Sequence, residues 1–285
     1  VRALLERGAD VPGLELIAVG RPELDLAEPG SAADLVRRIA PNVAISAAAY
    51  TAVDQAEDEP ELANRVNGGA PGELAAAARE IGARIIHLST DYVFDGRKPA
   101  PYREDDPVGP IGAYGRSKLL GEERVRAENP DHLILRTAWV YSPWGKNFVK
   151  TMLALARDRD EIGVVVDQHG NPTSAHDIAD GILAVLRAWD GGRRTGLGET
   201  FHLTGTGVTH WAGFATQIFR EADRLGRPTA AVRPVSTADY PTKASRPSNS
   251  MLDCTKFTRF FGYQAPRWQD SAALVVARLA EQAKL

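Results

Sequence analysis

A tyrosine and a lysine four residues apart have the spacing in this sequence that most directly suggests chemistry. Tyr114 and Lys118 occur in the segment Tyr-Gly-Arg-Ser-Lys, and residues at positions i and i+4 share one face of an α-helix. A nearby ammonium favours a phenolate, so Lys118 is expected to lower the pKa of Tyr114 from about 10. Thr90 supplies a hydroxyl after an apolar run. The three side chains predict a site that donates a proton to a carbonyl oxygen. A solvated helix face is the alternative interpretation of the pair.

Short apolar segments that alternate with helical patterns must position these side chains. The apolar runs at residues 14–19, 43–46, 84–89 and 132–137 predict strands, and residues 113–128 predict the helix that carries Tyr114. Strands that are apolar on both faces and separated by helices are typical of a buried parallel sheet. We expect an α/β fold with a Rossmann-like, doubly wound parallel sheet. Ligands bind beyond the carboxyl ends of the strands in such sheets.

The chain is predicted to divide near residue 145. Residues 1–145 are interpreted as a dinucleotide-binding domain, and residues 146–285 mainly as a smaller, mixed α/β substrate-binding lobe with segments that return to the first domain. A dinucleotide fold normally opens with a strand and a Gly-rich turn whose amides hold the pyrophosphate. This sequence begins within what is interpreted as the following helix. We expect N-terminal residues to precede it; the alternative is a truncated reading frame that binds no cofactor.

Composition and charge limit the class of protein. The net charge of −3 gives no reason to expect nucleic-acid or membrane binding. Apolar runs stay shorter than the roughly 18 residues of a membrane span, and no signal peptide is visible, so a cytoplasmic protein is expected. The single Cys254 excludes an internal disulfide, and the histidines lack metal-ligand spacing, so no metal site is predicted.

Small and acidic residues after two predicted strands are candidates for the cofactor side. Ala47, Ala48 and Ala49 follow residues 43–46, and small side chains there would let a flat cofactor lie against the backbone. A tightly packed turn is the alternative. Asp25 could accept from an adenine amino group while Leu26 covers the ring. A turn aspartate is the alternative for Asp25.

Arg21 bears on the choice between the two nicotinamide cofactors. A ribose-binding carboxylate is expected about 20 residues after the Gly-rich turn, but Gly20 and Arg21 occur at this place. Arg21 could contact a 2′-phosphate, which favours NADPH over NADH. A solvated arginine is the alternative.

Candidates for substrate binding lie beyond the same predicted strands. Val53 and Asp54 follow the alanine run. Asp54 could contact a substrate, or it could cap a helix. Trp139 follows residues 132–137 and could form an aromatic wall for a sugar, or it could belong to the core.

Several segments occur in an order that resembles one family. They are residues 47–54 (AAAYTAVD), 89–96 (STDYVFDG), 114–118 (YGRSK), 136–141 (RTAWVY), 147–148 (NF), 167–173 (DQHGNPT) and 245–250 (SRPSNS). Each segment is unspecific, but the series closely resembles the dTDP-4-dehydrorhamnose reductases, which are extended short-chain dehydrogenase/reductases. The resemblance covers nearly the whole sequence.

The resemblance implies NAD(P)H-dependent reduction of the C4 ketone of dTDP-4-dehydro-L-rhamnose to dTDP-L-rhamnose. It implies that Tyr114 protonates the developing alkoxide, that Lys118 holds the nicotinamide ribose, and that Thr90 orients the carbonyl and Tyr114. The resemblance also assigns cofactor, sugar and nucleotide contacts. The cofactor contacts are Asp25, Leu26, Ala47, Ala48, Ala49, Tyr114 and Lys118; the sugar contacts are Val53, Asp54, Thr90, Tyr92 and Trp139; the nucleotide contacts are Asn147 and Arg246.

Related proteins provide rival interpretations. A sugar-nucleotide 4,6-dehydratase would carry Asp-Glu where Asp91 and Tyr92 stand, and an epimerase fits the segments around Trp139 and Arg246 less well. A non-catalytic regulatory subunit, similar to that of methionine adenosyltransferase, is the alternative from another class. The intact proton-donating trio argues against it. The resemblance leaves open a Mg²⁺ requirement and the choice between a monomer and a homodimer.

Overall fold

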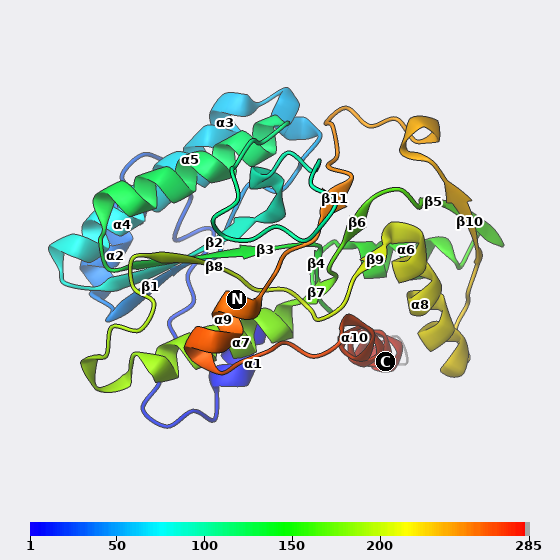
Figure 1. Cartoon of the computed structure of the whole chain (residues 1–285). Helices are drawn as coiled ribbons and strands as arrows, with labels where there is room; N and C mark the ends of the chain where they lie inside the picture. Colours follow the sequence, from blue (N-terminus) through cyan, green and yellow to red (C-terminus); the bar gives the residue numbers. More distant parts are fainter. Residues whose placement is uncertain (283–285) are drawn as a thin grey trace.

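A parallel sheet of four strands lies at the centre of the larger part of the molecule in the computed structural model, which describes residues 1–282 (Figure 1). Its strand order is β1-β2-β3-β8. The strands are β1 (Val43–Ser46), β2 (Arg84–Thr90), β3 (His132–Thr137) and β8 (Glu199–His202). Because all four strands run in the same direction, their carboxyl ends lie at one edge of the sheet.

Helices cover both faces of this sheet (Figure 1). On one face lie α2 (Ser31–Ile39), α4 (Ala70–Glu80) and α5 (Ala113–Glu128), with the short α3 (Pro60–Asn64) beside α5. On the other lie α1 (Arg2–Gly8), α7 (Ala175–Ala188) and α9 (Thr255–Phe261). The expected α/β, Rossmann-like, doubly wound arrangement is confirmed.

Alternating side chains of the central strands contribute to two apolar clusters, one on each face of the sheet. Ile85 and Ile134 belong to the apolar cluster that includes residues of α2 and α4. Ile86, Leu133 and Leu135 belong to the cluster that includes residues of α7. Successive side chains of a strand point to opposite faces, so strands that are covered on both sides must be apolar at nearly every position. This explains the continuous apolar runs of β2 and β3.

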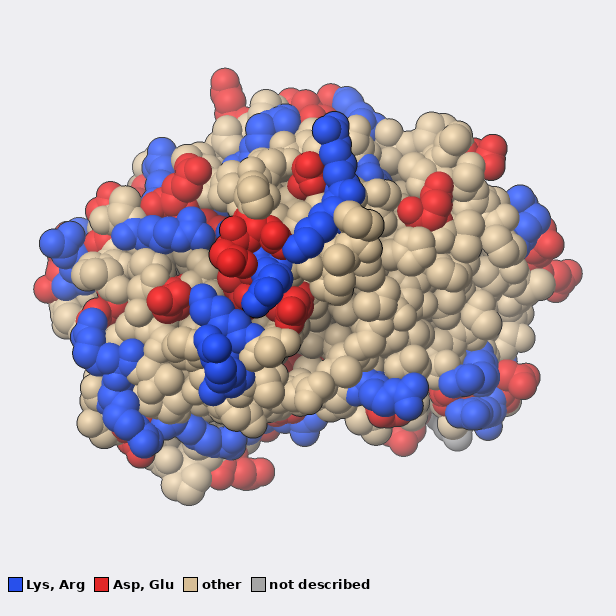
Figure 2. All heavy atoms as spheres, in the orientation of Figure 1, with Lys and Arg blue, Asp and Glu red and all other residues tan. Residues whose placement is uncertain are grey.

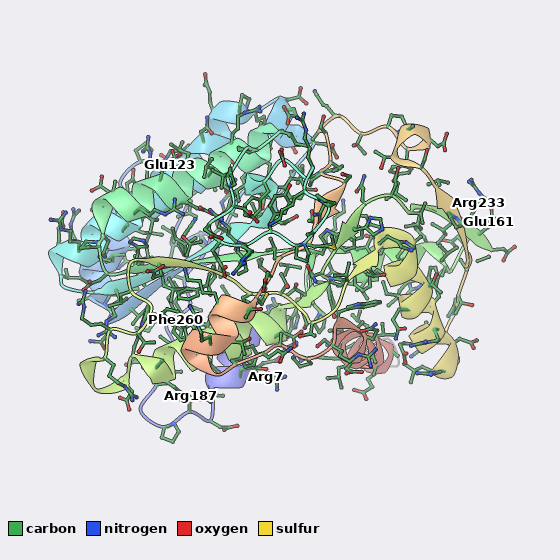
Figure 3. All side chains as sticks on the ribbon, in the orientation of Figure 1. Arg7, Glu123, Glu161, Arg187, Arg233 and Phe260 are labelled. Atoms are coloured by element: carbon green, nitrogen blue, oxygen red, sulfur yellow. The ribbon has the colours of Figure 1, made fainter. Side chains whose placement is uncertain are left out.

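A smaller group of helices and short sheets forms the remainder of the molecule. Its helices are α6 (Phe148–Leu155), α8 (Trp211–Arg224) and α10 (Trp268–Gln282). Its short strands are β4 (Val140–Tyr141), β5 (Glu161–Val165), β6 (His169–Gly170), β7 (Thr173–Ser174), β9 (Thr209–His210), β10 (Ala231–Val235) and β11 (Asn249–Ser250). Arg233 and Glu161, at 2.9 Å, join the parallel neighbours β10 and β5 at the outer edge (Figure 3). β8 nevertheless pairs with β3, so residues beyond 145 contribute to the central sheet.

The predicted strand at residues 14–19 is wrong. This stretch has no strand assignment, and within residues 1–282 the recorded partner of β1 is β2 alone. A strand requires a ladder of hydrogen bonds to a neighbour. The apolar pattern of residues 14–19 therefore does not suffice to make them a strand here.

The charged surface is mixed in sign. On the face in Figure 2, Lys and Arg side chains lie beside Asp and Glu side chains, and the middle of the smaller lobe carries few charges. Within residues 1–282, no helix has the length and apolar character needed to cross a bilayer.

Candidate active site at the carboxyl ends of the strands

Thr90 and Tyr114 meet where β2 ends and α5 begins. The Thr90 hydroxyl donates to Asp91 Oδ1 at 3.0 Å and accepts from the Tyr92 backbone N–H at 3.2 Å. Thr90 is also close enough to the Tyr114 side chain to act on its pKa. The rings of Tyr92 and Tyr114 pack edge to face, with centroids 5.4 Å apart. The structure thus brings together the hydroxyl and the phenol that the sequence pattern predicted.

Glycines allow α5 to lie this close to its neighbours. A Cβ on Gly115 would lie 2.2 Å from the Tyr92 carbonyl oxygen, and one on Gly121 would lie 2.2 Å from the Asn67 carbonyl oxygen. These distances are far below van der Waals contact, so any larger residue would push the helix away. Gly115, between Tyr114 and Arg116 in the motif, therefore allows α5 to pack against the loop after β2.

The pKa of Tyr114 is raised. Burial is the main cause of the rise; the neighbouring Thr90 hydroxyl opposes it, and Asp91 and Tyr92 add to it. This is opposite to the lowering by Lys118 that the spacing suggested. The reason is that the Tyr114 phenol is buried, while the Lys118 ammonium donates to the Leu88 carbonyl. A raised pKa keeps the phenol protonated at neutral pH, which is the form that a proton donor requires.

Lys118 is buried beneath the strand ends, with 2% of its surface exposed. Its ammonium donates to the Leu88 carbonyl at 2.7 Å and lies 3.5 Å from His87 Nε2. Burial lowers the pKa of Lys118 to about 8, and the Glu122 carboxylate opposes this shift. The charged form is thus present at neutral pH but close to its titration.

A buried ion pair anchors α5 to the sheet. Glu122 is fully buried and accepts two hydrogen bonds from Arg136 of β3, Nε to Oε1 at 2.8 Å and Nη2 to Oε2 at 2.7 Å. It also accepts from Ser89 of β2 at 2.6 Å and from Arg126 at 2.8 Å. Burial by itself would raise the pKa of Glu122, but the contacts with Arg136 lower it to about 2. The ionised carboxylate therefore links the helix of Tyr114 to two central strands.

Arg246 and Asp54, which were both predicted to bind substrate, form an ion pair beside Tyr92. Arg246 Nη2 donates to Asp54 Oδ2 at 2.6 Å, and Arg246 Nη1 lies 3.5 Å from the Tyr92 hydroxyl. The backbone N–H of Ala244 donates to Asp54 Oδ1 at 3.0 Å. Asp54 precedes a short 3₁₀ helix but makes no side-chain cap bond to it. The alternative helix-cap interpretation of Asp54 is therefore wrong. Val53, next to it, is half-buried.

Trp139 lies between the sheet and the smaller lobe. Its backbone has a φ of 49°, which is uncommon for a bulky residue. Its indole stacks on Trp211 with centroids 3.7 Å apart, and a Cβ on Gly170 would lie 2.6 Å from the indole. The ring is thus packed against Trp211 and Gly170 and has no recorded ring contact with Tyr114 among the described residues. Its predicted contact with a sugar remains a prediction.

The Asn147 side chain caps the N-terminus of α6. Its side chain accepts from the Lys150 N–H at the start of α6 and donates to the carbonyls of Ser142, at 2.8 Å, and Trp144, at 3.2 Å. These bonds give Asn147 a helix-capping role. A contact with the nucleotide remains a prediction.

The candidates for the cofactor lie near β1 and before α2. Ala47, Ala48 and Ala49 follow β1 and are partly or fully exposed. Asp25 Oδ1 accepts from Arg21 Nη2 and from the Ala27 N–H, both at 3.0 Å. Leu26 is 8% exposed and packs in the core with residues of α2. Within residues 1–282 no group of three His, Cys, Asp or Glu side chains is arranged to hold a metal ion.

Sequence reasoning missed several polar residues around this site. Asn67 accepts from the Tyr50 N–H at 2.8 Å and donates to the Ser117 hydroxyl at 2.9 Å, which ties α5 to the segment after β1. Asp91 is buried, and burial raises its pKa to about 6, with Ser250 among the opposing contacts. These partners are far apart in the sequence, so no local spacing could have identified them.

The parallel sheet with helices on both faces, together with Thr90, Tyr114 and Lys118 at the strand ends, defines a Rossmann-type short-chain dehydrogenase/reductase. Residues 2–281 match a family model described as the RmlD substrate binding domain. The dTDP-4-dehydrorhamnose reductase of Sinorhizobium fredii is 48% identical over 273 residues, which cover 96% of this chain and 92% of that protein. The chain therefore belongs to the dTDP-4-dehydrorhamnose reductase family.

Two solved structures have the same fold over nearly their whole length. A dTDP-4-dehydrorhamnose reductase from Clostridium acetobutylicum superposes with a TM-score of 0.88 at 37% identity and covers 98% of this chain and 95% of its own. The dTDP-4-dehydrorhamnose reductase of Bacillus anthracis, solved in complex with NADP, has a TM-score of 0.86 at 33% identity, covering 96% of this chain and 95% of that chain. The match thus includes the smaller lobe as well as the central sheet.

Proposed function

We propose that this chain reduces the C4 ketone of dTDP-4-dehydro-L-rhamnose to give dTDP-L-rhamnose, with NADPH as the reductant and Tyr114 as the proton donor. The observation that carries the proposal is that Thr90 and Tyr114 are neighbours at the carboxyl end of β2, the strand whose Leu88 carbonyl accepts from the buried Lys118 ammonium. The similarity to dTDP-4-dehydrorhamnose reductases supports the substrate, and the NADP complex of the Bacillus anthracis protein supports the choice of NADPH.

We assign separate roles in carbonyl reduction to Thr90 and Tyr114. Bound NADPH supplies the hydride that adds to C4 of the sugar. Thr90 orients the carbonyl and Tyr114 by hydrogen bonding, and Tyr114 gives its phenolic proton to the oxygen as negative charge develops there. A phenol with an ordinary pKa of about 10 is protonated at neutral pH, and burial of Tyr114 reinforces this form, so the proton is in place before the reaction begins. A positioned general acid typically accelerates such a step about 10²–10⁴-fold.

Features at the strand ends fit a nicotinamide cofactor. The Lys118 ammonium has three N–H groups and two recorded acceptors, Leu88 and His87, so one N–H is available for the ribose. Ala47, Ala48 and Ala49 offer small side chains beyond β1. We assign the adenosine end to Asp25 and Leu26, and a 2′-phosphate to Arg21, which would exchange its ion pair with Asp25 for the phosphate.

The sugar nucleotide is assigned to the surface beside Tyr92. The Arg246 guanidinium suits a diphosphate because it presents several donors in one plane, and Asp54 holds it in position. Tyr92, Val53 and Trp139 are assigned to the sugar, and Asn147 to the nucleotide side. This division places the reacting carbonyl between Thr90 and Tyr114.

The experiment follows NADPH absorbance in the presence of dTDP-4-dehydrorhamnose, for wild type and for Tyr114→Phe in the full-length protein. We expect substrate-dependent oxidation by wild type and a loss of about 100-fold or more in kcat for the variant, with an unchanged circular dichroism spectrum. A well-folded, NADPH-binding wild type that oxidises no cofactor would refute the proposal. Activity of Tyr114→Phe near that of wild type would refute the role of Tyr114.

A further inference from the structure

His87 is a buried titratable residue next to the site that takes no part in the chemical steps proposed above. It lies on β2 with 0% of its surface exposed, between β1 and α5. Its Nδ1 lies 3.1 Å from the Ser46 hydroxyl, and its Nε2 lies 3.5 Å from Lys118 Nζ. The imidazole thus contacts the active-site lysine on one side and an uncharged hydroxyl on the other.

We propose that His87 is a positioning residue for Lys118: its neutral imidazole accepts a hydrogen bond from the ammonium at Nε2, while the Ser46 hydroxyl oxygen accepts a hydrogen bond from Nδ1–H. This inference rests on the proposed function, because it concerns the lysine assigned to the cofactor ribose. His87 does not touch the reacting atoms in this assignment. It acts only through the direction and charge of Lys118.

The number of donors on Lys118 explains why two acceptors on β2 matter. The ammonium has three N–H groups in tetrahedral directions. Leu88 accepts one at 2.7 Å, and His87 lies in reach of a second. With two directions occupied, the third is determined, and a flexible side chain is held in one orientation. Lysine is otherwise a mobile point charge, so this restraint is what a fixed contact with a ribose requires.

The surroundings of His87 keep its imidazole neutral. Burial is the main cause of its lowered pKa, and the positive charge of Lys118 lowers the pKa further. Arg126 acts in the same direction and Glu122 opposes it, both from α5. On β1 the facing group is the uncharged Ser46. A neutral imidazole has one donor and one acceptor nitrogen, and the ammonium at Nε2 requires the acceptor there, so Nδ1 carries the proton.

The α5 helix packs closely against the His87 imidazole at Gly121. A Cβ on Gly121 would lie 3.2 Å from His87 Nε2. The helix therefore passes directly over the imidazole at a position without a side chain. The ring is confined between this position and Ser46, which restrains the direction in which Nε2 faces.

The first test measures the titration of Lys118 by NMR, using lysine labelled with ¹³C at Cε, in the protein without added cofactor. The Lys118 signal is assigned by its loss in Lys118→Met. In His87→Phe the acceptor is lost, and the acid-dissociation constant of Lys118 should rise about fivefold, which is the effect of one hydrogen bond. Its pKa should therefore fall below the wild-type value of about 8. His87→Gln retains an acceptor near the position of Nε2 and should restore the wild-type titration within about twofold.

His132→Phe provides the matched control, because His132 is also a buried histidine in the central sheet but bonds to the Asn129 carbonyl at 2.6 Å. It should leave the Lys118 titration unchanged. Where His87→Phe fails to fold, His87→Met replaces it, since methionine fills irregular apolar space, with the same expected shift. An unchanged Lys118 titration in a folded His87 variant, or an equal shift in His132→Phe, would overturn the proposal.

The second test measures kcat against pH with NADPH and the sugar nucleotide. Because the charged form of Lys118 is the one that binds the ribose, the alkaline fall in kcat should move to lower pH in His87→Phe and return in His87→Gln. A shifted Lys118 titration in an inactive wild type would contradict the proposed reaction while supporting the His87 contact. A wild-type enzyme that is active, with identical pH profiles in all His87 variants, would overturn the His87 contact and leave the reaction standing.

Discussion

Arg246 pairs with Asp54 across 192 positions of the sequence, with Arg246 Nη2 lying 2.6 Å from Asp54 Oδ2. The side chains are 20% and 46% exposed, respectively. The pair sits beside the Tyr92 hydroxyl, and so it connects the segment after β1 with the segment before β11 at the edge of the tyrosine pair. This guanidinium is the group that we propose contacts the diphosphate of the substrate.

The first prediction concerns this pair. Asp54→Asn should raise KM for the sugar nucleotide about tenfold, because Arg246 loses a charge-assisted hydrogen bond worth about 1.4 kcal/mol at this partly exposed place. We expect kcat to fall by less than tenfold, since the Asp54 side chain pairs with Arg246 and not with the proposed proton donor Tyr114. Steady-state kinetics measure both. Asp58→Asn is the control, because Asp58 pairs with Lys243 of the same segment; an equal rise in KM there would contradict a specific role for Asp54.

The second prediction concerns the buried anchor of α5. Glu122→Gln should destabilise the protein by about 3–5 kcal/mol, because Arg136 keeps its charge in a buried site without its partner. Urea unfolding measures the free energy. Glu123→Gln, on the exposed side of the same helix (Figure 3), should change it by less than about 0.5 kcal/mol. Similar values for the two variants would show that the Glu122–Arg136 pair contributes little.

The third prediction concerns the glycine within the Tyr–Lys motif. Gly115→Ala places a methyl group 2.2 Å from the Tyr92 carbonyl oxygen, so α5 or the loop after β2 must shift. We expect a loss of about 1–3 kcal/mol in stability and a fall in kcat, since Tyr114 moves with the helix. Gly20 has open space around its Cα, so the control variant Gly20→Ala should alter neither kcat nor the free energy of unfolding. Wild-type kcat and stability in Gly115→Ala would contradict this close approach.

The fourth prediction concerns pH and Asp91. Burial raises the pKa of Asp91 to about 6 from an ordinary 3.8, so the folded state holds this proton more tightly than the unfolded chain. Its contribution to stability is therefore present at low pH and is lost as pH rises from about 4 to about 6. Asp91→Asn cannot lose a proton, so it should gain up to about 3 kcal/mol relative to wild type between pH 4 and pH 7. Unfolding free energies at both pH values measure this; a constant difference would contradict the raised pKa.

Local sequence patterns account for the central strands, for the helix of Tyr114 and for the residue types to which we assign the chemistry. Continuous apolar runs predicted β2 and β3 because both faces of these strands are covered, and the Tyr114–Lys118 spacing predicted one helix that carries both side chains. The series of family segments identified the reductase family. Such features are local, and local spacing on a helix or strand follows directly from backbone geometry.

How these groups are held and charged depends on contacts that form only in the folded chain. It placed Asp54 on Arg246, occupied Asn147 as a helix cap, stacked Trp139 on Trp211, and left residues 14–19 without a strand partner. It also reversed the expected pKa shift of Tyr114, because burial acts on the charge more strongly than a lysine whose ammonium is held by Leu88 and His87. The strength of a charge interaction depends on depth and on partners from distant segments, and neither is encoded in the spacing of a motif.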